Sequence, residues 1–159
     1  EDQIEEGWKR RHQSERPEEF MTEEGIAFSP DGITFDPDGR ILLTELKVTW
    51  MSCRGCPITK EQSEQTKAFL RGKELRLPVT WDGISDTSFD PKMDKFFTQM
   101  KFYTRNLRLE WSRLITLFIN GDWRPSRPVV LAWDFHYTQR ELNECHAGLI
   151  NHARSKGML

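Results

Sequence analysis

The sequence predicts an α/β protein in which a central mixed β-sheet is flanked by α-helices. A turn signal lies at residues 36–39, where Asp-Pro-Asp-Gly supplies the residue types that β-turns prefer. The flanking residues 33–35 and 40–50 are rich in β-branched and aromatic side chains, which favours strands. Farther along, Asp90 and Pro91 predict the start of a long helix, because they supply a capping oxygen and a proline at the first helical position.

The remaining segments complete the order of elements. We expect a helix at residues 2–13, a strand at 20–28, a polar helix at 59–71 and a Gly-, Asp- and Ser-rich connection at 77–89. Strands are expected at 114–119 and 129–137, with a turn at 120–122 after the first of them. A capping box at 138–141 predicts the start of a final helix, which ends near residue 154. The chain has 159 residues, which is long enough for one core, so we expect a single domain over residues 1–159.

The composition limits the classes of function. The chain carries 23 basic and 25 acidic residues, with a formal net charge of −2, so any contact with nucleic acid must come from local basic patches. No stretch reaches a membrane-spanning length, and nothing at the start reads as a signal peptide. Three cysteines without an export signal favour a reducing, cytoplasmic setting.

Two carboxylates and one ammonium group are expected to meet at the hairpin. Asp31 precedes its first strand, and Glu45 and Lys47 lie toward the end of its second. Side chains alternate along a strand, so one face of the second strand carries Ile41, Leu43, Glu45 and Lys47. An apolar face that becomes charged toward its end is typical of a core strand that opens into a cleft.

These residue types suit the hydrolysis of a phosphodiester with a divalent metal. Mg²⁺ takes carboxylate, carbonyl and water oxygens, so Asp31, Glu45 and the carbonyl of Leu46 would be its ligands. Lys47 would hold the attacking water or stabilise the charge that develops at the phosphate. The residues alone also allow a simpler interpretation, a Glu–Lys pair on the surface of an edge strand, which contributes little.

A second motif lies on the long helix. Gln99 and Tyr103 are four residues apart and therefore share one face of the helix. The Pro-Asp pair ending at Asp31, the Glu-x-Lys of Glu45 and Lys47, and this Gln-x-x-x-Tyr element together resemble the PD-(D/E)XK nuclease superfamily, in particular its RecB-like and phage λ-exonuclease-like branch. The resemblance implies that Gln99 and Tyr103 support the metal site and the DNA backbone. Without it, both would be ordinary helix contacts.

The resemblance also implies a restriction-endonuclease-like core and a Mg²⁺- or Mn²⁺-dependent deoxyribonuclease. Its catalytic residues would be Asp31, Glu45, Lys47, Gln99 and Tyr103. We expect an exonuclease of phage-type recombination or repair that acts on DNA inside the cell, with a phage in a bacterial host as one source. The sequence leaves open whether it cuts ends or internal bonds, whether it forms a homo-oligomer, and whether a recombination protein is its partner.

Several features have more than one interpretation. Many members of the superfamily carry an acidic residue on the first helix, and Glu1, Glu5 and Glu6 are equally available, so none is assigned. A nuclease-fold module that binds DNA or a protein without cutting is the main alternative function. A third is an interaction domain organised by a metal at Cys53 and Cys56, although ordinary thiols are the expected state because zinc needs four ligands.

Local basic patches are the expected DNA contacts. Lys101, Arg105 and Arg108 are spaced to share one face of the Gln-x-x-x-Tyr helix, and further basic residues lie between 54 and 76. Each of them, taken singly, also fits ordinary solvated surface.

Overall fold

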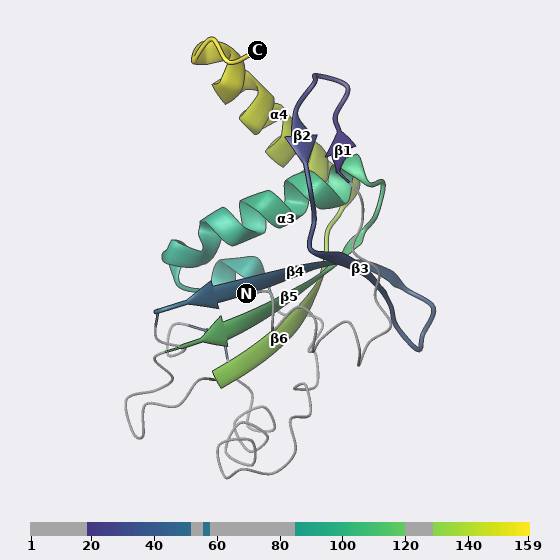
Figure 1. The fold of residues 1–159 in the computed structure, drawn as a ribbon, viewed down its shortest axis with the longest axis vertical. Coiled ribbons are helices and arrows are strands. Elements are labelled where there is room, and N and C mark those ends of the chain that lie inside the picture. Colours follow the sequence, from purple (N-terminus) through teal and green to yellow (C-terminus); the bar gives the residue numbers. More distant parts are fainter. Residues whose placement is uncertain (1–18, 52–55, 58–84, 120–128) are drawn as a thin grey trace.

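Four strands form one mixed sheet in the computed structural model, which describes residues 19–51, 56–57, 85–119 and 129–159 (Figure 1). They lie in the order β3 (Gly32–Phe35), β4 (Ile41–Thr49), β5 (Trp111–Phe118) and β6 (Val129–His136). The central neighbours β4 and β5 run parallel, whereas β3 pairs with β4 and β6 with β5 in antiparallel fashion. The predicted class, α/β with a mixed sheet flanked by helices, is confirmed.

The hairpin between β3 and β4 forms where the turn signal predicts it. One carboxylate oxygen of Asp36 accepts hydrogen bonds from the backbone N–H groups of Asp38 and Arg40, at 2.9 Å each. Gly39 adopts a φ of +82°, a conformation that glycine takes without steric cost. The turn therefore closes the pairing at Phe35 and Ile41 and fixes the register of the hairpin.

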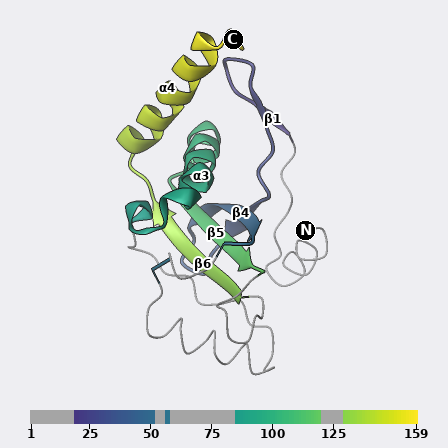
Figure 2. The same ribbon diagram turned by 90° about the vertical axis from the view of Figure 1, so that its left-hand side faces the viewer.

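The long helix crosses one face of the sheet (Figure 2). Asp90 caps it by accepting from the backbone N–H of Lys92, as predicted, and Pro91 follows at the first position. The first turn, η3 (Pro91–Met93), is a 3-10 helix, and α3 (Asp94–Asn106) continues from it as an α-helix. The predicted start of the long helix is therefore confirmed, and its first turn is a 3-10 turn, which is frequent at the ends of α-helices.

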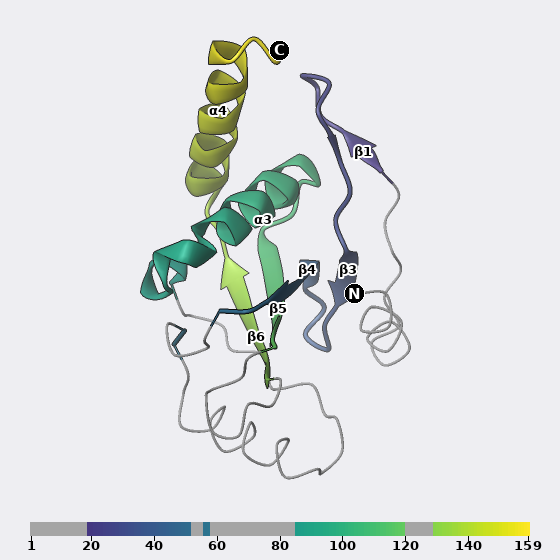
Figure 3. The same cartoon turned by 60° about the vertical axis from the view of Figure 1, so that its left-hand side comes forward.

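The final helix, α4 (Gln139–Ser155), packs against α3 rather than on the sheet (Figure 3). Its predicted capping box is present: the Thr138 hydroxyl accepts from the backbone N–H of Glu141, and the Glu141 carboxylate accepts from that of Thr138. Two such reciprocal bonds satisfy helix-end donors that would otherwise lack partners.

The expectation of one strand at 20–28 was wrong. The segment folds back on itself as a two-stranded hairpin of β1 (Phe20–Met21) and β2 (Ala27–Phe28). Gly25 at a φ of +85° makes the reversal, and the backbone N–H of Thr22 donates to the carbonyl of Ile26. The tip is fixed to α4, because a carboxylate oxygen of Glu24 lies 3.0 Å from Nε2 of His146.

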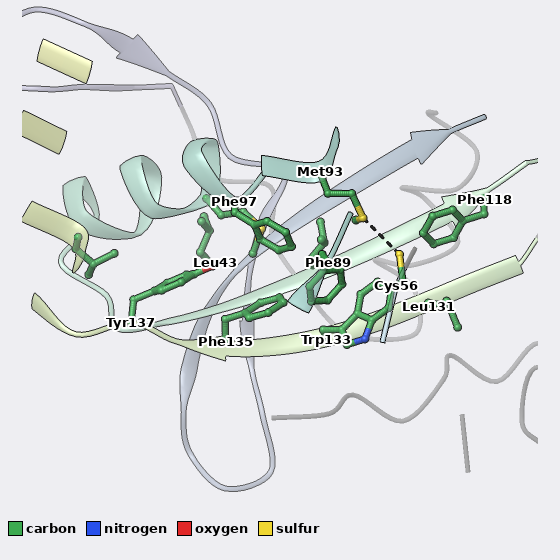
Figure 4. Close-up of a cluster of buried hydrophobic side chains, with 13 residues drawn as sticks. Leu43, Cys56, Phe89, Met93, Phe97, Phe118, Leu131, Trp133, Phe135 and Tyr137 are labelled. Atoms are coloured by element: carbon green, nitrogen blue, oxygen red, sulfur yellow. Dashed lines mark hydrogen bonds between the residues drawn. The ribbon is translucent and has the colours of Figure 1, made fainter. Parts of the chain in front are cut away.

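The main core lies between α3 and the sheet. Aromatic side chains fill it, with the Phe89 ring at a centroid distance of 4.9 Å from both Phe97 and Trp133 (Figure 4). Cys56 is buried in the same cluster, and its thiol donates to the sulfur of Met93 at 3.4 Å. On the opposite face of the sheet, Arg113 and Asp134 form a buried bidentate ion pair, with distances of 2.8 and 2.9 Å.

Several predictions fall outside the described residues: the helices at 2–13 and 59–71, the turn at 120–122, residues 77–84 of the connection at 77–89, the basic residues between 54 and 76, Cys53, and the acidic candidates Glu1, Glu5 and Glu6. Of that connection, the end is described and contains a short 3-10 turn, η2 (Asp86–Ser88). Within the described part of the chain, no helix has the length and apolar character needed to cross a membrane.

Candidate active site

Glu45 lies in the middle of the sheet and is almost fully buried. It is paired with Leu114 of β5 on one side, and its side chain is only 1% exposed. Leu43, on the same face, is 0% exposed, but Ile41 at the start of that face is 43% exposed. The apolar-to-charged face predicted for β4 is therefore correct from Leu43 onward, whereas the first residue of that face is exposed.

Asp31 lies at the bend that leads into β3 and contacts β4 through its side chain. Its Oδ2 accepts from the backbone N–H of Leu46 at 2.8 Å. Its own backbone N–H points to Oε2 of Glu45 at 3.5 Å, the limit of a hydrogen bond. The two carboxylates thus lie beside each other at the point where β3 begins.

The carbonyl of Leu46 faces this same edge of β4. In a strand, the N–H and C=O of one residue point to the same side, and the N–H of Leu46 points to Asp31. β3 begins with Gly32 opposite Thr44, so a continued register would bring Pro30 opposite Leu46. Proline has no N–H to donate to that carbonyl. In that register the carbonyl of Leu46 would receive no hydrogen bond from Pro30 and would face the same edge as the two carboxylates.

Lys47 and Gln99 both bind one oxygen of Glu45. Nζ of Lys47 lies 2.9 Å from Oε1, and the side-chain amide of Gln99 donates to the same oxygen at 2.8 Å. The amide of Gln99 also donates to the hydroxyl of Tyr103 at 3.1 Å. The side chains of Lys47, Glu45, Gln99 and Tyr103 are thus joined by hydrogen bonds, and Asp31 joins them through its backbone N–H. Within the described residues, Oε2 of Glu45 makes this weak contact with the Asp31 N–H.

Burial dominates the electrostatics of Glu45. It raises the pKa of this carboxyl from 4.5 to about 7, because the charged form is desolvated. The ammonium group of Lys47 lowers the pKa and the neighbouring charge of Asp31 raises it, and neither outweighs burial. A divalent cation between the two carboxylates would relieve both unfavourable effects.

The donor set fits a hard divalent cation. Among the described residues, no group of three His, Cys, Asp or Glu side chains converges on one point, so side chains alone do not build a complete metal site there. The carboxylates of Asp31 and Glu45 do lie side by side, and strand geometry directs the carbonyl of Leu46 to the same edge. Mg²⁺ usually binds one or two protein carboxylates and keeps waters and substrate oxygens as its other ligands. The residues present therefore fit Mg²⁺ or Mn²⁺.

Two aromatic side chains that the motifs did not indicate complete the surroundings. The ring of Phe28 stacks on that of Tyr103 at a centroid distance of 5.1 Å. The ring of Phe96 lies 5.8 Å from Nζ of Lys47. Phe96, Gln99 and Tyr103 follow helical spacing, so periodicity could have placed Phe96 beside the motif. Phe28 gave no such signal, because its contact depends on how the β1–β2 hairpin packs.

The basic residues predicted on α3 do not form one free face. Nζ of Lys101 lies 2.8 Å from a carboxylate oxygen of Asp86. Arg105 contacts Asn143 and His146 of α4. Arg108 lies beyond the end of the helix with a φ of +57° and does not share the face at all, so that part of the prediction was wrong.

Comparisons with family models, with curated proteins and with solved structures found no match to this chain. The function proposed below is therefore based on the geometry of the site and on the resemblance of its residues to a known family.

Proposed function

We propose that this protein is a metal-dependent DNA nuclease of the PD-(D/E)XK type. The observation that carries the proposal is that Asp31, Glu45 and Lys47 lie together at the edge of β4 where β3 begins. A structural role explains this group poorly, because burial of Glu45 beside a second carboxylate disfavours its charged form, and the ammonium group of Lys47 offsets only part of that cost. A surface Glu–Lys pair would leave Glu45 in solvent, whereas the residue is 1% exposed.

Asp31, Glu45 and the carbonyl of Leu46 would hold Mg²⁺ or Mn²⁺. A cation bound there would polarise the phosphate and lower the pKa of a coordinated water. Oε2 of Glu45 is the suitable ligand atom, because Oε1 is already bound by Lys47 and Gln99.

Lys47 supplies the positive charge next to the reacting phosphate. With a cation bound at Glu45, the ammonium group of Lys47 would be available to orient the attacking water or to stabilise the developing negative charge. Gln99 holds Glu45 in its orientation through the 2.8 Å bond. The Tyr103 hydroxyl accepts from Gln99 and so keeps its own proton to donate to a phosphate oxygen of the DNA backbone.

The finer parts of the proposal follow the sequence resemblance. They are a restriction-endonuclease-like core in a single domain, exonuclease action in phage-type recombination or repair, and an intracellular setting. The described topology is compatible with such a core, since a mixed sheet carries the site on a parallel-paired central strand next to an antiparallel hairpin.

The first experiment is cleavage of end-labelled linear and of closed circular DNA, single- and double-stranded, with Mg²⁺, Mn²⁺ or EDTA. Lys47→Ala is compared with Lys156→Ala, which changes an exposed lysine at the end of α4. We expect metal-dependent cleavage that Lys47→Ala lowers by about 10²-fold or more and Lys156→Ala leaves unchanged. Circular substrates distinguish endonuclease from exonuclease. A wild type that binds DNA but cleaves none of these forms would refute the proposal in favour of a non-cleaving module.

A further inference from the structure

A second lysine lies beside the candidate active site with no role in it. Lys95 is exposed, in the first turn of α3, and its Nζ is 5.2 Å from the centroid of the Phe96 ring. Lys47 lies 5.8 Å from the same centroid. The two ammonium nitrogens are therefore at most about 11 Å apart, since both distances end at one point.

Nothing in the described part of the chain neutralises Lys95. No carboxylate there lies within ion-pair distance of its Nζ, in contrast to Lys47, which binds Glu45, and Lys101, which binds Asp86. Contact with the ring of Phe96 orients the ammonium group without cancelling its charge, because a cation–π contact uses the electrons of an uncharged partner.

The helix directs Lys95 and Phe96 toward the same region as Gln99. Lys95 is four residues before Gln99 and Phe96 is three residues before it, so both adjoin Gln99 on the helix surface. Gln99 is bound to Glu45, and this fixes the side of α3 that faces the proposed metal site. Lys95 thus extends the line of polar groups away from the reacting centre.

We propose that Lys95, held by Phe96, binds the DNA phosphate adjacent to the one that is cleaved. Successive phosphates of one duplex strand are about 3.4 Å apart along the helix axis. An ammonium group no more than about 11 Å from that of Lys47 therefore has the neighbouring phosphate within its reach. In this arrangement Lys47 serves the scissile phosphate and Lys95 serves its neighbour. The inference rests on the proposed function and adds a substrate requirement: at least one nucleotide beyond the cut must carry its backbone charge.

The test measures DNA binding in EDTA, where no cleavage occurs. Wild type, Lys95→Gln and the matched control Lys156→Gln are titrated with a short oligonucleotide over a range of salt concentrations. Loss of one phosphate contact is expected to reduce the slope of log K against log salt by about 0.9 for Lys95→Gln alone. Since Lys95 is exposed, its substitution should leave the unfolding midpoint unchanged, and circular dichroism on all three proteins checks this.

A set of oligonucleotides with one neutral methylphosphonate each then locates the contact. At one position next to the cut, the neutral group should weaken binding of wild type and of Lys156→Gln but not of Lys95→Gln, because the interacting charge is already gone. Phe96→Leu should weaken the same coupling, since it removes the ring that orients Lys95.

Two outcomes would overturn the inference. One is that no methylphosphonate position couples to Lys95. The other is that inorganic phosphate displaces DNA equally well whatever the position of the neutral group, which would indicate a site for a free anion. Failure of the proposed function has a different signature: the wild type binds DNA and shows this coupling but does not cleave with Mg²⁺ or Mn²⁺.

Discussion

Replacing Glu45 by glutamine should change how stability depends on pH. In the folded protein the pKa of Glu45 is about 7, against an ordinary value of 4.5. The folded state therefore binds the proton more tightly than the unfolded state, and the contribution of Glu45 to the free energy of unfolding is fully present below pH 4.5 and is lost as the pH rises through 7. At about 1.4 kcal/mol for each unit of pKa, the loss amounts to about 3 kcal/mol between pH 4.5 and 8.

Urea unfolding of wild type and Glu45→Gln, followed from pH 5 to 8.5 in EDTA, measures this loss. Glutamine cannot ionise, so the stability of the variant relative to wild type should grow with pH across this range. Adding millimolar Mg²⁺ at pH 8 should stabilise only the wild type, because a ligand stabilises the state that binds it. A difference between the two proteins that stays constant with pH would refute the reasoning, since Glu45 would then not titrate in this window.

Three further predictions concern other contacts. Tyr103→Phe keeps the ring and removes the hydroxyl, so kcat/KM for DNA should fall about tenfold while the free energy of unfolding hardly changes. Glu24→Gln should destabilise the protein at neutral pH, because the hydrogen bond to His146 holds the pKa of Glu24 at about 2. This stabilisation is lost when Glu24 is protonated, so the difference in free energy of unfolding between wild type and variant should shrink as the pH falls from 4.5 toward 2. Urea unfolding measures this difference. Asp134→Leu should lower the free energy of unfolding by about 3–5 kcal/mol, because it leaves Arg113 charged and buried. Adding Arg113→Leu to the same chain should restore most of that stability, and equal stability of the single and double variants would contradict this.

The elements that the sequence predicted correctly are those held by contacts between residues close together in the chain. The turn between β3 and β4 was readable because Asp36 bonds to backbone groups two and four residues away. The start of α4 was readable because Thr138 and Glu141 bond to each other. In both cases the sequence contains all the partners within one turn of chain.

The β1–β2 hairpin was missed for the opposite reason. Its pairing is only two residues on each side, and the apolar residues around Phe20 and Phe28 resemble one continuous strand. What separates the two strands is the reversal at Gly25, whose stability depends on the distant contact between Glu24 and His146. Partners 122 positions apart leave no pattern in a single sequence.

In the candidate site, too, some contacts could be predicted from short-range sequence patterns and others could not. Asp31, Glu45 and Lys47 could be brought together from the register of one hairpin, and Gln99 with Tyr103 from helical spacing. Their meeting depends on how α3 crosses the sheet, and only the resemblance to a known family suggested it. Helical spacing also places Lys95 beside Gln99, whereas the position of Phe28 relative to the site follows from packing and could not be predicted.

The turn between β3 and β4 tolerates an inserted residue better than a deleted one. The pairing of Phe35 with Ile41 and of Gly32 with Thr44 sets Asp31 beside Leu46. A residue inserted between 36 and 40 can bulge outward as a longer loop and leave this pairing intact. A residue deleted there shortens a turn that is already closed, so the strands must slip, and a slip by one position turns every second side chain to the other face. We therefore expect homologous chains to vary this loop by lengthening it and seldom by shortening it.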